Sequence, residues 1–542
     1  MRAARFVRVA NRIGRLLAVE AGGSPLAAMA RSALAATTRD PIAALIAICG
    51  AEAVAIEAER RRIYAHDIHN VGATPLAVVR PATRKTAADA IGCATAHGLA
   101  VFPRGGGMSY TDAYLPTTTA SIVLDTGALD TIVEIDARGL WATVEAGCSW
   151  AKLDAALAPH GVRAAFWGPF SGHDATVGGS LSNGTATFGS GTAGTSGANV
   201  LGFEIALADG RIVRTGMDAQ PGHAPFFDQY GPNLTGLFAN DCGALGVKLA
   251  VTLPLVPRSA HVGGLSFVFP DFAALAGALE AVARAGLATE ALAMDSVVTE
   301  QFSGAPDIGA DLNMLRQIAR GRGGLKRTFR AATGGRAFLK RPGFHAHFIA
   351  EGRDARDLAL RLDAIRALTG AGAEIPNTVP SAIRAVPFSP LNATDPKGRR
   401  VLPIHGIVPY AAAESLHCAI MDIVTRSATA AVEARLVVAT SFFAVGPNAL
   451  LYEPVFYWED SLSPYQLAKT TAAARYADNP AARALVETMS DTTVEAMYAN
   501  GAAHLQIGRR YPYARDRDLT LLRAVKAAVD PRNLLNPGVL GL

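Results

Sequence analysis

Short apolar runs punctuated by glycine begin near Pro75 and predict alternating strands and helices. Residues 76–79 and 99–102 are continuous apolar runs of strand length. Residues 83–97 lie between them and carry a helical pattern. This order predicts a βαβ-like unit, which residues 122–124 continue with another strand.

Two hairpins, a helix and a long strand are predicted after this unit. Residues 149–160 carry a helical pattern that Gly161 ends, because glycine suits the left-handed conformation of a helix stop. The hairpins are residues 131–135 with 141–145 and residues 203–207 with 211–214, and the last strand pattern covers residues 247–256.

Changes in residue composition and in the expected elements divide the chain into four parts. The first residues are rich in Ala and Arg and mostly helical in pattern, whereas the region after Pro257 alternates Ala/Leu-rich helices with a few strands. We therefore expect an α+β protein with a helical extension over residues 1–69, a glycine-rich domain of two α/β parts over 70–257, an α+β domain over 258–500 and a tail over 501–542.

Composition places the chain among ordinary globular proteins. Half of its 542 residues are apolar, and the formal net charge of +5 gives only mild attraction to anions, so no nucleic-acid partner is expected. The five cysteines lie far apart without metal-ligand spacing, which indicates reduced thiols in the cytoplasm and no metal site. No run reaches the roughly 20 apolar residues that a membrane-spanning helix needs.

The first 20 residues form a basic amphipathic pattern that leaves three interpretations open. The segment could target the protein to an organelle, contact a membrane surface, or pack on the protein itself with its basic face in solvent. Its basic residues recur every three or four positions, at Arg2, Arg5, Arg8, Arg12 and Arg15.

Two glycine-rich loops carry the main chemical signal. The first follows the strand at 99–102 and reads Arg104-Gly105-Gly106-Gly107-Met108-Ser109. Three glycines without side chains let backbone amides approach a pyrophosphate, although a plain flexible turn is the alternative. The second loop, residues 168–184, is dense in small residues that can lie against a planar or charged ligand. Together the loops predict a large ligand.

A formal GxGxxG match at residues 189–194 raises the alternative of a nicotinamide cofactor. That fingerprint works between a strand and a helix, because the helix N-terminus completes the phosphate site. Residues 195–201 instead contain further glycine and turn residues before a strand, so we interpret the match as accidental.

The motifs in this order resemble the vanillyl-alcohol oxidase and p-cresol methylhydroxylase superfamily of flavoproteins. The resemblance covers residues 64–257 well and the remainder loosely. It implies an FAD-binding domain of two α/β subdomains and an α+β cap domain that faces the flavin ring. The segments that carry it include residues 75–81, 103–109, 177–180, 206–210, 243–247 and Asn536-Pro537-Gly538.

The same resemblance implies which residues bind the cofactor. Arg104 to Ser109 would hold the pyrophosphate, and Asn536 would reach the ring from the tail. Gly246 and Val247 would pack on the nucleotide. The remaining cofactor-binding candidates are Pro169, His173, Thr176, Val177, Gly178, Gly179, Ser180, Asn183 and Gly184.

Noncovalent FAD is expected from two departures from the superfamily. Some members bind flavin through a histidine in the first glycine loop, where this chain has Gly107, Met108 and Ser109. Neither Cys148 nor Cys242 lies in the loop from which other members add a cysteine link. A bond to a cap histidine is the alternative.

Four residues are candidates for the chemistry. Oxidation of a C–H bond beside oxygen or nitrogen needs a group that takes the hydroxyl proton. His405, in an expected inward-facing strand over 402–409, and His504 are each either that base or an ordinary buried histidine. Arg510 would bind a substrate carboxylate or form a surface ion pair. Tyr457 would anchor a phenolate or fill the core.

Substrate markers of the superfamily are incomplete in this chain. Members that oxidise 2-hydroxy acids carry a Gly-Asp-Gly-Asn stretch and a glutamate-histidine-glycine segment, and both are missing. Phenol-oxidising members carry a tyrosine-arginine pair where this chain has Gly501-Ala502-Ala503. Residues 405–410 and 450–457 nevertheless look more like a phenol-oxidase cap. We expect an FAD-linked oxidase or dehydrogenase of an aromatic or other alcohol or a 4-substituted phenol.

Two other functions and several partners stay open. The chain could oxidise a D-2-hydroxy acid such as lactate or glycolate, or it could be a flavin-binding electron-relay subunit of a complex. Oxygen or another acceptor would reoxidise the flavin. A homodimer is one expected assembly.

Overall fold

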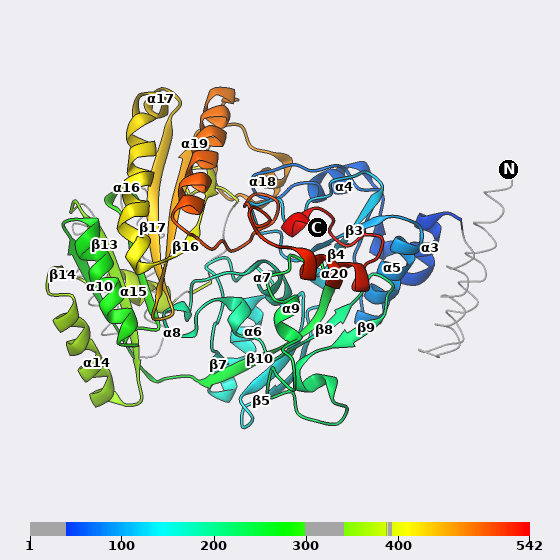
Figure 1. Ribbon diagram of the computed structural model, residues 1–542, viewed down its shortest axis with the longest axis horizontal. Helices are drawn as coiled ribbons and strands as arrows, with labels where there is room; N and C mark the ends of the chain where they lie inside the picture. The colour runs from blue at the N-terminus through cyan, green and yellow to red at the C-terminus, as the bar shows by residue number, and fades with distance from the viewer. Residues whose placement is uncertain (1–38, 299–340, 386, 389–392) are drawn as a thin grey trace.

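The computed structural model describes residues 39–298, 341–385, 387–388 and 393–542. Figure 1 shows two parts side by side, which we call the loop domain, built on strands β1 to β10, and the cap, built on strands β11 to β18. The basic segment at residues 1–20 and part of the expected helical extension lie outside the described residues.

A mostly parallel sheet forms one side of the loop domain. Its order is β1-β2-β4-β3, in which β2, β4 and β3 run parallel. The expected βαβ order is confirmed, and Thr83 caps helix α5 by accepting a hydrogen bond from the Thr86 N–H. The elements are α3 (Pro41–Cys49), β1 (Val54–Ala55), α4 (Ala58–Tyr64), β2 (Ala77–Val79), α5 (Arg84–Ala96), β3 (Ala100–Arg104) and β4 (Ser121–Asp125).

An antiparallel sheet of order β5-β6-β10-β8-β9, with β7 also paired to β10, completes the loop domain. Both predicted hairpins are present, as β5 with β6 and β8 with β9. Gly161 adopts the expected left-handed conformation after α6, with φ of 70°. The strands are β5 (Ile132–Asp136), β6 (Trp141–Glu145), β7 (Val162–Ala164), β8 (Gly202–Ala206), β9 (Ile212–Arg214) and β10 (Val247–Pro257), and the helices are α6 (Trp150–Leu157), α7 (Val177–Asn183), α8 (Ser190–Ala193) and α9 (Thr235–Phe238).

The GxGxxG match lies on the short helix α8. This helix follows the loop after α7, and a 3₁₀ turn at Ser196–Ala198 separates it from β8. The strand-to-helix context that dinucleotide binding requires is therefore not formed by these described residues.

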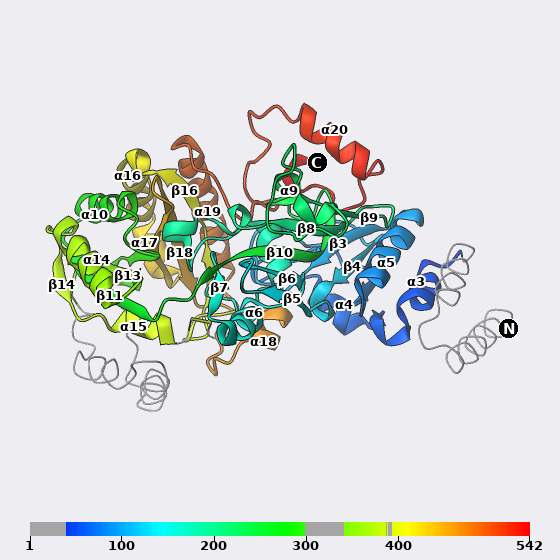
Figure 2. The same cartoon turned by 90° about the horizontal axis from the view of Figure 1, so that it is seen from below.

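An antiparallel sheet of order β14-β11-β13-β12-β17-β18-β15 forms the cap, with β16 also paired to β18. Figure 2 shows β10 leading from the loop domain toward this sheet. The strands are β11 (His261–Phe269), β12 (Glu290–Met294), β13 (Phe344–Gly352), β14 (Ala373–Ile375), β15 (Arg400–Pro403), β16 (Gly406–Pro409), β17 (Leu436–Val445) and β18 (Ala449–Trp458), and the helices are α10 (Phe272–Arg284), α14 (Ala355–Leu368), α15 (Thr378–Ala385), α16 (Tyr410–Arg426), α17 (Ala428–Glu433), α18 (Pro464–Lys469) and α19 (Pro480–Ala499).

Strand β18 divides its side chains between the two faces of the cap sheet. Successive strand residues point to opposite faces. Tyr452, Phe456 and Trp458 are buried in the cap core with residues of α10, α16 and α19. The intervening positions, which include Glu453 and Tyr457, line the space toward the loop domain.

Residues 402–409 do not form the single strand that the sequence predicts. They form β15 and β16, separated at Ile404 and His405, and both strands pair with β18. The opposing residue, Pro454, accepts a hydrogen bond from the Ile404 N–H but has no N–H to donate, so the ladder is interrupted. The His405 N–H donates instead to the Tyr511 hydroxyl at 3.1 Å.

The C-terminal tail returns to the loop domain and packs beside β3 (Figure 1). Leu535 pairs with Val101, and helix α20 (Thr520–Val529) supplies a buried cation at Lys526. Its Nζ donates to the Ala244 carbonyl, the Leu535 carbonyl and the Asp530 carboxylate at 2.6–2.8 Å. One ammonium group thus ties the tail to the loop before β10.

Replacing Lys526 with methionine is expected to destabilise the protein by about 3 kcal/mol, because it leaves the buried Asp530 carboxylate without its cation. Urea unfolding of the purified variant measures the change. Arg523→Met on the exposed side of the same helix is the control, with an expected change within about 0.5 kcal/mol. Equal stabilities of the two variants would contradict this role.

Among the described helices, none combines the length and the apolar character required to cross a membrane.

Candidate active site

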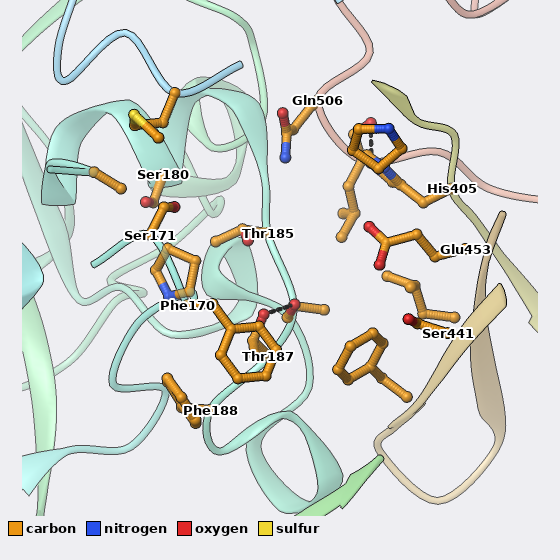
Figure 3. A pocket seen from close by; sticks show the side chains of 18 of the residues that line it. Phe170, Ser171, Ser180, Thr185, Thr187, Phe188, His405, Ser441, Glu453 and Gln506 are labelled. Carbon is orange, nitrogen blue, oxygen red and sulfur yellow. Dashed lines mark hydrogen bonds between the residues drawn. The ribbon is translucent and has the colours of Figure 1, made fainter. Parts of the chain in front are cut away.

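A cavity of about 870 Å³ lies between the loop domain and the cap. Figure 3 shows Ser171 and Ser180 of the loop domain facing His405, Ser441 and Glu453 of the cap across it. A smaller cavity of about 50 Å³ adjoins it and shares four lining residues, namely Gly105, Tyr114, Gly179 and Asn183. The larger volume is in the range of ligand sites.

The two glycine loops pack directly against each other beside this cavity. A Cβ added to Gly105 would collide with Thr176 Oγ1, and one added to Gly106 would collide with the Asp174 carbonyl. Gly107 has φ of 73°, a conformation that glycine adopts at little cost. The glycine triplet is therefore required by the contact between the loops as well as by the need for an exposed backbone.

The Arg104 side chain lies beneath the first loop and supports it. Its guanidinium donates to the carbonyls of Tyr64 and His66 and lies 4.9 Å from the ring centroids of Tyr64, Tyr114 and Tyr465. Burial among three aromatic rings and two carbonyls commits this cation to the protein. Any contact of Arg104 with a pyrophosphate would thus come from its backbone.

The second glycine loop ends in a short helix, which its glycine content did not predict. Helix α7 begins after Thr176, whose hydroxyl accepts a hydrogen bond from the Gly179 N–H at 3.2 Å. Within 4 Å, a Cβ on Gly179 would meet only Thr176 Oγ1, and Gly179 lines both cavities. The missing side chain therefore leaves room for a ligand that spans them.

Most of the predicted cofactor residues line one cavity or the other. Those on the larger cavity are Gly105, Gly106, Gly107, Met108, Ser109, Pro169, Thr176, Gly179, Ser180, Asn183 and Gly184. Those on the smaller cavity include Arg104, Gly178, Gly246 and Val247.

Three predicted cofactor residues line neither cavity. His173 is exposed beside Asp174, and Val177 is buried in the core of the loop domain. Asn536 is buried, and its amide donates to the carbonyls of Ala113 and Cys242. Asn536 therefore fastens the tail to the loops that surround the site.

His405 lies on the cap wall of the cavity as a neutral imidazole. Its Nε2 is 3.0 Å from the Leu505 carbonyl, which can only accept, so Nε2 carries the proton. Burial lowers the pKa of His405 to about 4, with a smaller effect from His504. Nδ1 is thus an unprotonated acceptor on a residue that lines the cavity.

Glu453 faces His405 across the strand interruption. The pairs Pro403 with Val455 and Gly406 with Tyr452 place these two residues opposite each other. Figure 3 shows the Glu453 carboxylate directed into the cavity beside His405. Burial in this apolar wall raises the pKa of Glu453 to about 7.

The raised pKa makes stability depend on pH. Glu453 is protonated in both states below about pH 4.5, and between about pH 4.5 and 7 the unfolded chain loses its proton first, so stability falls as pH rises. At pH 8 the free energy of unfolding of Glu453→Gln should therefore be about 2 kcal/mol higher than that of the unmodified protein, and at pH 4 the two should be equal. The expected gain is smaller than the roughly 3 kcal/mol that the pKa shift represents, because solvent in the cavity screens part of the effect. Urea unfolding at both pH values checks this, and an equal gain at both would contradict it.

The other predicted catalytic residues divide between the cavity and its surroundings. Tyr457 lines the cavity, and burial raises its pKa. The His504 Nδ1–H donates to the His405 carbonyl, and the His504 ring stacks on Tyr511 outside the described lining. Arg510 also lies outside it and forms ion pairs with Glu487 and Asp491.

Three residues of the site were not singled out by the sequence-based prediction, although two of them lie in ranges that it marked as candidate regions, residues 452–458 and 504–513. Glu453 could have been found as an acid in the otherwise apolar strand pattern of residues 449–458. Tyr110 follows the first loop directly and lines the cavity. Gln506 lies at φ of 51° with a buried Oε1 that no described residue bonds, and Figure 3 shows its amide directed into the cavity. No sequence pattern distinguishes this glutamine.

Comparison with protein families gives two matches on this chain. Residues 75–216 match an FAD binding domain, and residues 470–540 match the C-terminal domain of FAD linked oxidases. The first match contains both glycine loops, and the second contains Gln506 and Asn536. The prediction of FAD as the cofactor is confirmed by these matches.

Curated relatives match over shorter stretches. An uncharacterized FAD-linked oxidoreductase of Mycobacterium tuberculosis is 28% identical over 232 residues, which are 42% of this chain and 48% of the relative. The mitochondrial D-lactate dehydrogenase (cytochrome) 1 of Saccharomyces cerevisiae is 31% identical over 188 residues, 34% of this chain and 30% of the relative. The chain thus matches about half or less of the length of these relatives.

A solved structure of p-cresol methylhydroxylase with substrate bound shares the fold. It superposes with a TM-score of 0.71 at 16% identity and covers 93% of this chain and 96% of that chain. The expected α+β architecture is confirmed by this likeness and by the sheets described above.

Proposed function

Because residues 75–216 match an FAD binding domain, residues 470–540 match the C-terminal domain of FAD linked oxidases and the fold is that of p-cresol methylhydroxylase, we propose that the chain oxidises a small hydroxyl-bearing substrate in the cavity between loop domain and cap. The observation that carries the proposal is the arrangement of the cavity. Glycine-rich backbone forms one wall, and His405 with Glu453 forms the opposite wall.

The residues of the loop domain fit FAD. The open space beyond Gly179 would accept a ligand that extends from the larger cavity into the smaller one. The unpaired Gln506 Oε1 would accept a hydrogen bond from it, since buried polar atoms are ordinarily satisfied. When bound, FAD supplies the hydride acceptor.

His405 and Glu453 would handle the proton that the substrate loses. His405 Nδ1 can accept a hydrogen bond from a substrate hydroxyl and orient it, because Nε2 is fixed by Leu505. The Glu453 carboxylate opposite His405, with a pKa of about 7, can hold the released proton near neutral pH. His504 supports His405 through its backbone carbonyl and has no direct role in this proposal.

An aromatic or other alcohol or a 4-substituted phenol is the substrate that we favour. Phe443, Leu451 and Val455 give the cap wall an apolar surface, and Tyr457 adds a phenol group. A D-2-hydroxy acid is the second candidate, which the name of the yeast relative favours.

The flavin is proposed to be noncovalently bound. The first glycine loop has Gly107, Met108 and Ser109 where some members of the superfamily carry the linking histidine. Oxygen or another acceptor would take the electrons afterwards. The free thiols of all five cysteines support a cytoplasmic location for this enzyme.

An absorption spectrum and anaerobic substrate additions test the proposal. The purified protein should show flavin bands, and the 450 nm band should bleach with one member of a series of benzylic alcohols, 4-alkylphenols and 2-hydroxy acids. A protein without flavin would refute cofactor binding. A flavin that no substrate bleaches would favour an electron-relay subunit. Colour that remains with acid-precipitated protein would refute noncovalent binding.

A further inference from the structure

The larger cavity has an acidic side chain on its wall but no basic one among its described lining residues. Its described lining contains no lysine or arginine, and Glu453 is its carboxylate-bearing residue. The nearby arginines are engaged elsewhere. Arg510 pairs with Glu487 and Asp491 on α19, and Arg399 makes a two-pronged contact with Asp395 while its guanidinium stacks over the Tyr457 ring.

Glu453 is positioned to meet a bound substrate. It lies on the cavity face of β18, and no described residue forms a hydrogen bond or an ion pair with its carboxylate. Tyr110 and Tyr457 lie close enough for the carboxylate to contribute to raising the pKa of each phenol. Above its pKa of about 7 the group is thus a negative charge in an apolar wall with no cation from the described residues to offset it.

We propose that Glu453 determines substrate choice by excluding carboxylates, so that the substrate is an uncharged hydroxyl compound with an apolar body. The inference rests on the proposed function and names the substrate class of that site. A carboxylate placed beside Glu453 would bring two like charges together in a desolvated space, whereas a neutral hydroxyl can bond to either form of the side chain.

The shape of the cavity agrees with a neutral apolar substrate. Several aromatic and aliphatic side chains line the cavity beside the hydroxyl and amide groups, and together they can bury a ring or a hydrocarbon chain. These side chains include Phe170, Phe188, Leu292, Phe443, Leu451 and Val455.

Equilibrium binding to the oxidised FAD-loaded protein tests this selection without requiring turnover. Three matched pairs serve as probes: 1-phenyl-1,2-ethanediol with mandelate, 4-hydroxybenzyl alcohol with 4-hydroxybenzoate, and benzyl alcohol with benzoate. Perturbation of the flavin spectrum at about pH 8.5, where Glu453 is mostly ionised, gives each Kd. The neutral member should bind at least about tenfold more tightly in the pairs that bind, as expected for discrimination against an unpaired charge.

Variants at Glu453 separate charge from shape. Glu453→Gln should reduce the preference to below about threefold by strengthening binding of the acid, and Glu453→Asp should keep the preference because it keeps the charge. Glu487→Gln, which lies outside the cavity, is the control and should change nothing.

The inference is overturned if no neutral member binds more tightly than its acid, or if Glu453→Gln leaves the preference unchanged. If Glu453→Gln fails to fold, the neutral and acidic members of each pair can still be compared in the unmodified protein and in Glu453→Asp. Flavin that bleaches readily with mandelate would overturn the inference while leaving the proposed oxidoreductase function intact. A protein without bound flavin would instead refute the proposed function.

Discussion

His405→Gln is expected to lower turnover of the FAD-loaded protein by about 10²-fold, because it removes the imidazole Nδ1 that orients the substrate hydroxyl toward Glu453. Glutamine can keep a donor for the Leu505 carbonyl but has no basic nitrogen at the position of Nδ1. Anaerobic single-turnover bleaching of the flavin, followed with the best substrate of the screen, measures the loss directly. The flavin spectrum and the unfolding midpoint should stay close to those of the unmodified protein.

His504→Gln is the matched control for this experiment. His504 is a neighbouring histidine of the same wall, but its ring stacks on Tyr511 at 4.0 Å and lies outside the described cavity lining. We expect its bleaching rate to fall less than about fivefold, through small shifts of the His405 backbone. A larger loss in His504→Gln than in His405→Gln would show that the orienting role has been assigned to the wrong histidine.

Gly179→Ala is expected to weaken FAD binding by about tenfold to a hundredfold while leaving the apoprotein as stable as before. Alanine within helix α7 gains about 0.5–1 kcal/mol in helix propensity, which a 3.0 Å contact with Thr176 Oγ1 partly offsets. The added methyl group would enter the space that the two cavities share, and overpacking of this kind costs about 1–3 kcal/mol. Titration of apoprotein with FAD and urea unfolding without FAD measure the two effects.

Gly106→Ala should behave in the opposite way. Its Cβ would collide with the Asp174 carbonyl, so the second loop must shift even without cofactor, and the apoprotein should lose about 1–3 kcal/mol. If Gly179→Ala instead destabilised the apoprotein as much as Gly106→Ala does, the space beside Gly179 would be part of the protein core. FAD affinity unchanged by Gly179→Ala would show that the cofactor does not cross between the cavities there.

The local elements of the loop domain could be predicted because each rests on nearby residues. Thr83 caps α5, Gly161 provides the left-handed stop after α6, and β5 with β6 is a hairpin of adjacent strands. The glycine triplet was equally visible. Its contact with Thr176 and Asp174 was not, because it joins loops that are distant in the sequence.

The catalytic wall was harder to predict because it depends on strand register. The sequence offered His405 and His504 as equivalent candidates, and only the pairing with β18 places His405 opposite Glu453. The interruption at His405 also depends on Pro454 in the neighbouring strand. Arg510 illustrates the same limit, since its partners Glu487 and Asp491 come from α19.

The returning tail has a consequence for biosynthesis. Lys526 and Asn536 fasten loops that border the cavities, yet the ribosome adds them only after the loop domain and the cap. The strands of the loop domain can pair while the cap is still being synthesised, but these loops gain their final contacts only when the tail arrives. We therefore expect stable retention of FAD to follow synthesis of the tail, and a nascent protein to pass through a cofactor-free stage whose lifetime depends on the docking of this tail.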